Sequence, residues 1–290
     1  MAQKFTNQTV FILLAIGLVV LGIGCSVAAA EQKVTSSQTQ SVSVKGSDSV
    51  LPLAQAEAEE YMKEKPGKSV SVTGGGSGVG IAALIDKGLD VADASREMTT
   101  DEIKKANSNG VSPVKYVIAY DGITVIVNPK NPVTKLTFDQ LRGIYGGNIS
   151  NWKEVGGEDK PIVVISRDSS SGTYVDFKND IGFAEYRPDA LTQATTGGIV
   201  SEVSQNPNAI GYIGFAYVDK GVKVLSVDNG NGAVMPTVDS IQSGKYPLYR
   251  TLQVYTNGEP SGLTKEFVDF ELSPKGQDVV KKVGYIPLNK

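Results

Sequence analysis

One short stretch of this sequence combines a strong cation with several hydrogen-bond donors. Residues 167–173 read RDSSSGT, so Arg167 is followed by three serines, a glycine and a threonine. The apolar run 162–165 before it predicts a buried strand, and residues 174–178 after it predict a helix. A helix N-terminus offers free backbone N–H groups and a partial positive charge, and a guanidinium suits phosphate or carboxylate. The stretch therefore fits either an anion site or an ordinary capped helix.

Three further turns carry glycine or small hydroxyl residues directly after a predicted strand. They are GSDS at 46–49, GGGSGVG at 74–80 and the pair Ser95-Arg96 after the strand 91–94. The glycine loop lacks the Gly-Lys-Ser/Thr ending of a nucleotide-binding P-loop. In α/β sheets, ligands bind beyond the carboxyl ends of strands, where turns lead into helices. Together the four turns predict one oxyanion held between two parts of the chain.

The alternation of predicted strands and helices indicates an α/β fold with a mostly parallel sheet in each of two lobes. We expect residues 42–122 and 250–290 to form the first lobe and residues 123–249 to form the second. The two crossings between them are predicted hinges, near 120–123 and 246–252.

Local patterns predict several element boundaries. Thr99-x-x-Glu102 and Thr137-x-x-Gln140 are capping boxes that begin helices. Trp152 is interpreted as a packing anchor rather than a ligand platform. Apolar, β-branched runs predict separate strands at 114–119, 122–128 and 222–227.

Composition excludes many catalytic mechanisms. The chain has a net charge of −3, no histidine, and one cysteine. Ser-His-Asp and Cys-His catalysis, histidine-ligated zinc and an internal disulfide are therefore excluded. A serine enzyme using Ser77 or Ser171 would lack an evident base. We predict no catalytic residue, no metal, no cofactor, and no binding to nucleic acid, since the chain has no basic run.

The N-terminus predicts export. Residues 10–24 are apolar, too short for a typical membrane span, and resemble a secretory signal. LGIGC at 21–25 resembles a lipobox and favours Cys25 as a lipid attachment site, whereas AAA at 28–30 fits ordinary cleavage. An uncleaved anchor is the third alternative. Residues 1–25 are interpreted as the leader and 26–41 as a flexible linker.

Several motifs resemble the PstS family of phosphate-binding proteins of ABC importers. The resemblance covers about 41–290, through GSDSVLPLAQ (46–55), GGGSGVGI (74–81), DVADASR (90–96) and RDSSSGT (167–173). It implies a two-lobed periplasmic-binding-protein type II fold with two hinge crossovers, closing on inorganic phosphate without catalysis or a cofactor. It also implies a monomer at the extracytoplasmic face of the membrane or in the periplasm, delivering phosphate to permease and ATPase subunits. A receptor for sulfate or another tetrahedral oxyanion, and an adhesion or signalling receptor, are alternatives.

The resemblance also implies which residues hold the anion. The matching positions are Ser49, Val50, Ser77, Ser95, Arg167, Ser171, Gly172 and Thr173. Neighbouring candidates are Ser47, Asp48, Gly78, Arg96 and Ser169.

The sequence departs from the family pattern at two positions. Many relatives carry an aspartate at the place of Ser169, and others carry a carboxylate at the place of Ser95. Phosphate at neutral pH carries a proton that needs an acceptor, whereas sulfate carries none. A serine oxygen can accept, and the candidate carboxylates are Asp48, Asp93 and Asp168.

Arg96 has two interpretations. It could line the cleft, or it could pair with Glu97 or Asp93, since an ion pair is the commoner fate of an arginine.

Overall fold

The computed structural model describes residues 40–288. The predicted leader, Cys25 and nearly all of the predicted linker lie outside these residues. The strands are β1 (Gln40–Gly46), β2 (Lys68–Thr73), β3 (Val91–Ala94), β4 (Pro113–Val127), β5 (Lys135–Thr137), β6 (Val163–Arg167), β7 (Leu191–Gln193), β8 (Ala209–Gly214), β9 (Lys223–Val224), β10 (Ser226–Asp228), β11 (Ala233–Val234) and β12 (Tyr249–Asn257). The helices are α1 (Leu51–Glu64), α2 (Ser77–Ile85), α3 (Thr100–Ser108), α4 (Phe138–Gly146), α5 (Gly172–Ile181), α6 (Thr196–Gln205), α7 (Val238–Gln242), α8 (Gly262–Leu272) and α9 (Pro274–Lys282), with 3-10 turns η1 (Trp152–Val155) and η2 (Phe215–Tyr217).

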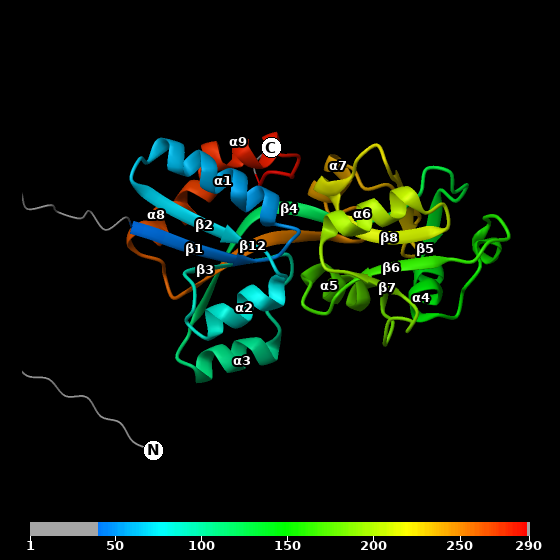
Figure 1. Ribbon diagram of the computed structural model, residues 1–290, viewed down its shortest axis with the longest axis horizontal. Helices are drawn as coiled ribbons and strands as arrows, with labels where there is room; N and C mark the ends of the chain where they lie inside the picture. Colours follow the sequence, from blue (N-terminus) through cyan, green and yellow to red (C-terminus); the bar gives the residue numbers. More distant parts are fainter. Residues whose placement is uncertain (1–39, 289–290) are drawn as a thin grey trace, which may run out of the picture. The chain divides into compact units, whose positions relative to one another are not determined.

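One sheet runs through both lobes in the order β2-β1-β3-β12-β4-β8-β6-β7, with β9 also paired to β4. β1 is parallel to β2 and β3 in the first lobe, and β6 is parallel to β7 and β8 in the second. β12 and β4 run antiparallel between these two groups, as Figure 1 shows. The parallel strands therefore end in turns that lead into helices, which is where the predicted site residues lie.

The prediction of separate strands at 114–119 and 122–128 is wrong, because β4 is one strand, Pro113–Val127. It pairs with β12 through Gly122 and with β8 from Ile123. Gly122 fits there because a Cβ atom would lie 2.8 Å from the Cδ1 atom of Ile241. The lobe limits predicted from the sequence stay a prediction, and this change of partner supports them.

The single strand predicted at 222–227 is also wrong. The segment divides into β9, which pairs with β4, and β10, which pairs with β5 in a separate three-stranded sheet. Leu225 between them is fully buried, and its N–H donates to the carbonyl of Val125 at 2.9 Å. The chain thus changes sheets at a buried leucine, which an apolar run in the sequence does not reveal.

The local predictions are confirmed where they depend on neighbouring residues alone. Both capping boxes form, at Thr99 and Thr137. Trp152 is buried in the core of the second lobe, and its Nε1–H donates to the carbonyl of Asn208 at 2.9 Å. Among residues 40–288, no helix is long and apolar enough to cross a membrane.

Three buried carboxyl groups lie inside the first lobe. Glu57 on α1, Glu271 on α8 and Asp93 on β3 are fully buried, and their carboxyl oxygens have no hydrogen-bond partner within the described chain. Burial raises the pKa of Asp93 to about 8, and the neighbouring charge of Asp48 adds to that rise. Burial also raises the pKa values of Glu57 and Glu271, which repel one another when charged. Burial therefore favours the protonated, neutral form of these three carboxyl groups.

The free energy of unfolding should consequently fall as the pH rises toward 8. The pKa of Asp93 is higher in the folded protein (about 8) than its ordinary value of 3.8, so the folded state holds more protons between these values. One such group contributes a slope of at most ~1.4 kcal/mol per pH unit. Urea denaturation between pH 5 and pH 8 should show a smaller slope for Asp93→Asn, with the exposed Asp278→Asn as the matched control. An unchanged slope in Asp93→Asn would contradict this.

Candidate functional site

Three helix N-termini from two lobes meet at one place. α1 and α2 begin after the first-lobe strands β1 and β2, and α5 begins after the second-lobe strand β6. The backbone N–H of Gly78 donates to the carbonyl of Ser170 at 2.9 Å, and the hydroxyls of Ser49 and Thr173 are 2.9 Å apart. Free backbone N–H groups and the partial positive charges of helix N-termini favour a bound anion.

The two lobes approach one another closely at Gly172. A Cβ atom at this position would lie 2.4 Å from the Oγ of Ser77 and 2.7 Å from the Oγ of Ser95. No side chain larger than hydrogen fits there without moving the first-lobe serines. This glycine thus lets the Ser-Gly-Thr turn reach the first-lobe hydroxyls.

The first-lobe serines form a buried hydrogen-bonded group. The Oγ of Ser47 donates to the Oγ of Ser95 at 3.0 Å, and the Oγ atoms of Ser77 and Ser95 are 3.3 Å apart. The backbone N–H of Ser95 donates to the Oγ of Ser77 at 3.1 Å. Hydroxyls can both donate and accept, so this group can reorient its protons toward a ligand.

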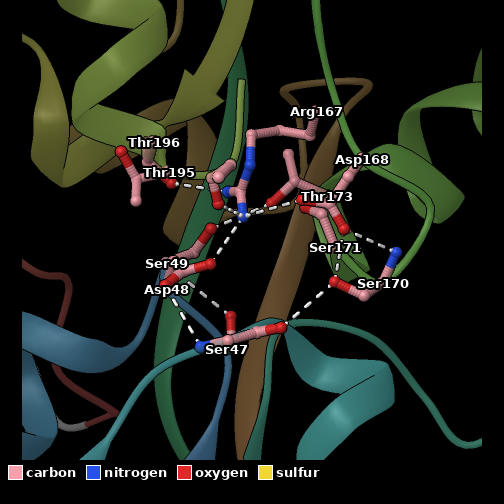
Figure 2. Close-up of polar contacts among 12 residues, drawn as sticks. Ser47, Asp48, Ser49, Arg167, Asp168, Ser170, Ser171, Thr173, Thr195 and Thr196 are labelled. Carbon is pink, nitrogen blue, oxygen red and sulfur yellow. Dashed lines mark hydrogen bonds and ion pairs between the residues drawn. The ribbon is translucent and has the colours of Figure 1, made fainter. Parts of the chain in front are cut away.

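Arg167 is the last residue of β6 and is only 2% exposed. Its guanidinium donates to the Oγ1 of Thr196 at 3.0 Å and to the carbonyls of Gln193 at 3.2 Å and Ala194 at 2.9 Å. A fourth donor bond, 2.6 Å long, goes to the carboxylate of Asp48 from the other lobe (Figure 2). The second lobe therefore fixes the side chain of Arg167 and points its charge at the first lobe.

Asp48 is the candidate acceptor that lies in the site. Its carboxylate contacts Arg167, and its Oδ1 also accepts from the N–H of Gly75 at 3.3 Å. Asp168 turns instead to Ser170, from whose N–H it accepts at 2.9 Å. Asp93 is buried behind the turn that holds Ser47, whose N–H donates to the Asp93 carbonyl at 3.1 Å.

The remaining predicted residues differ in position. Val50 is buried at the start of α1, and its backbone N–H donates to the carbonyl of Ser47 at 3.0 Å. Ser171 caps α5 by accepting from the N–H of Tyr174 at 3.3 Å. Ser169 is exposed. Its exposure separates it from Arg167 and Thr173, which lie on the same turn and are buried.

The structure corrects part of the sequence interpretation of Arg96. Its carboxylate partner is Glu102, through two bonds of 2.7 Å, rather than Glu97 or Asp93. The side chain is 7% exposed and packs beside Gly172, because a Cβ atom on that glycine would lie 3.1 Å from the Cγ of Arg96.

Sequence reasoning missed one buried ion pair beside the site. Arg250 on β12 is 8% exposed and donates to the Oγ1 of Thr173 at 3.1 Å. Its carboxylate partner is Asp121 on β4, which is 2% exposed. The sequence contains one signal for this pair: a charged residue stands within each of the two predicted hinges. In the described part of the chain, no group of three or more His, Cys, Asp or Glu side chains could hold a metal ion.

Two α/β lobes joined by two long antiparallel strands form the fold of the periplasmic binding proteins, and a profile of the PBP superfamily domain matches residues 33–275. The phosphate-binding protein PstS of Borreliella burgdorferi is 35% identical over 222 residues, which cover 72% of this chain and 76% of that protein. A Clostridium perfringens protein crystallised with bound phosphate has a TM-score of 0.79 and 38% identity, over 86% of this chain and 99% of that one. An ABC-type phosphate transport receptor from Vibrio cholerae has a TM-score of 0.71 and 34% identity, over 84% of this chain and 99% of that one. This chain therefore belongs to the PstS family of the PBP superfamily.

Proposed function

We propose that this protein is an exported receptor that binds inorganic phosphate between its lobes and delivers it to the permease and ATPase subunits of an ABC importer. The observation that carries the proposal is the meeting of the Ser-Gly-Thr turn with the first-lobe serines beside Arg167. Relatives named for phosphate binding and phosphate transport support the same ligand. We further propose that the receptor is a monomer, that it acts by binding rather than catalysis, and that Cys25 anchors it through a lipid outside the cytoplasm.

The proposed ligands of phosphate come from both lobes. The first lobe would supply Ser49, Ser77 and Ser95 with the backbone at Val50, and the second would supply Arg167 with the turn 171–173. A tetrahedral anion has four oxygens pointing in different directions, so donors from opposite sides can satisfy all of them at once. Closure of the lobes would exclude water and so strengthen each of these hydrogen bonds.

Asp48 favours phosphate over sulfate as the ligand. A carboxylate only accepts hydrogen bonds, so a neighbouring anion must bring a proton to it. Phosphate at neutral pH has that proton, whereas sulfate would place an unprotonated oxygen against the carboxylate. Asp48 thus supplies a negative acceptor at Arg167 although Ser169 occupies the place where the family resemblance leads us to expect an aspartate.

Arg167→Gln should reduce phosphate affinity by at least ~100-fold, or ~2.7 kcal/mol, because the anion would lose a charged donor in a dry site. Isothermal titration calorimetry measures this change. Arg142→Gln is the matched control, since Arg142 pairs with Asp139 on α4 and is 46% exposed. Phosphate affinity within threefold of the unmodified protein would remove Arg167 from the site.

Gly172→Ala should weaken phosphate binding by at least ~10-fold, or ~1.4 kcal/mol, since its methyl group would collide with the hydroxyls of Ser77 and Ser95. The folding of each lobe should be little affected, because those hydroxyls belong to the opposite lobe. Gly197→Ala is the control, as it lies in the first turn of α6 with open space around its added methyl group. Equal phosphate affinities for the two variants would contradict the proposed meeting of the lobes.

Asp48→Asn should lower selectivity, because an amide can donate as well as accept. The ratio of sulfate to phosphate dissociation constants should fall by at least ~10-fold, which corresponds to ~1.4 kcal/mol. Titrations of the unmodified protein and of Asp48→Asn with phosphate, arsenate and sulfate at one pH give this ratio. Tight sulfate binding by the unmodified protein would instead favour the sulfate receptor as its function.

A further inference from the structure

A buried ion pair lies where the crossing strands β4 and β12 leave one another. Asp121 and Arg250 are directly opposite in the register of the two strands. The Nε and Nη2 atoms of Arg250 donate to the Oδ2 of Asp121 at 3.0 Å and 2.8 Å. The next residue pair, Gly122 with Tyr249, is the last of this ladder before β4 pairs with β8.

Each member of the pair makes one further bond into the second lobe. The other carboxylate oxygen of Asp121 accepts from the N–H of Phe215 at 2.9 Å, at the end of β8. The remaining terminal nitrogen of Arg250, Nη1, donates to the Oγ1 of Thr173 at 3.1 Å. The ion pair therefore connects both crossing strands to the turn that begins α5.

The bond from Arg250 restricts the directions open to the Thr173 hydroxyl proton. A guanidinium has donors only, so the oxygen of Thr173 must accept from it. The single hydroxyl proton of Thr173 then has to point elsewhere. The Oγ of Ser49, 2.9 Å away across the lobes, can receive that proton or donate to the second lone pair of Thr173.

We propose that Arg250 is a positioning residue that holds the hydroxyl of Thr173 as a donor toward the bound oxyanion. This inference rests on the proposed function, because it takes Thr173 as a ligand of phosphate. All three nitrogens of Arg250 donate within the protein, two to Asp121 and one to Thr173, so its contact with the proposed phosphate ligands is through Thr173. Without Arg250, the threonine hydroxyl would be free to rotate and to present its lone pairs to the anion.

A double-mutant cycle distinguishes positioning from a general structural role. Phosphate affinity is measured by calorimetry for the unmodified protein, Arg250→Gln, Thr173→Val and the double variant. Each single change should weaken binding by at least ~10-fold, and the double variant should bind within ~3-fold of Thr173→Val, because both changes remove the same donor. Losses that multiply, or an Arg250→Gln variant that binds as the unmodified protein does, would overturn the inference.

The folding of each variant is checked in a separate experiment. Asp121 would be left buried without its cation in Arg250→Gln, so each variant is first checked by thermal unfolding without phosphate. Should Arg250→Gln fail to fold, Arg250→Gln combined with Asp121→Asn takes its place in the cycle, with Asp121→Asn as the reference. Arg142→Gln on α4 is the matched control and should bind phosphate normally.

Titration of the unmodified protein distinguishes a failure of this inference from a failure of the proposed function. If it binds no phosphate but binds another oxyanion, the phosphate proposal fails and the same cycle is run with that anion. If it binds phosphate and the cycle shows no coupling, only the role of Arg250 fails. Binding of none of phosphate, arsenate, sulfate and molybdate would overturn both.

Discussion

The arrangement of this site depends on the burial of Arg167. A guanidinium stays protonated in a protein, so burying it requires acceptors in the plane of its donors. The second lobe supplies acceptors from Gln193, Ala194 and Thr196, all at the junction of β7 and α6. The first lobe supplies the closer of its two carboxylate partners, Asp48 at 2.6 Å, whereas Asp168 lies 4.0 Å away. The guanidinium that would attract an anion thus also forms an ion pair between the lobes.

The same compensation occurs at the other two buried arginines. Arg96 pairs with Glu102, and Arg250 pairs with Asp121. An anion at the proposed site would therefore meet arginines that already have carboxylate partners. Oriented hydroxyls, backbone N–H groups and helix N-termini would then add fixed dipoles to the charged donor of Arg167. Such a site discriminates between anions by their pattern of donors and acceptors more than by their net charge.

The sequence predicts those parts of the fold that depend on neighbouring residues. The capping boxes at Thr99 and Thr137 form because both members lie within one helical turn. The continuity of β4 was not predictable locally, because it depends on partners from β12 and β8 that are distant in sequence. The pairings of Arg167 with Asp48 and of Arg250 with Asp121 were not predictable for the same reason, since the partners are 119 and 129 residues apart. The motifs could indicate which turns carry chemistry, but only the folded chain brings their charges together.

The crossing strands combine a buried ion pair with an irregularity in their pairing. Register between β12 and β4 shifts between Leu252 and Gln253, and such irregularities let a strand bend while its neighbours stay paired. The Arg250–Asp121 pair lies on the second-lobe side of this shift and is bonded to Thr173 and Phe215 of that lobe. A bend at the irregularity would consequently move the first-lobe turns relative to a second-lobe turn that keeps its orientation. With the buried charges beyond such a bend, the Ser-Gly-Thr turn would keep its geometry while its distance to Ser49 changed.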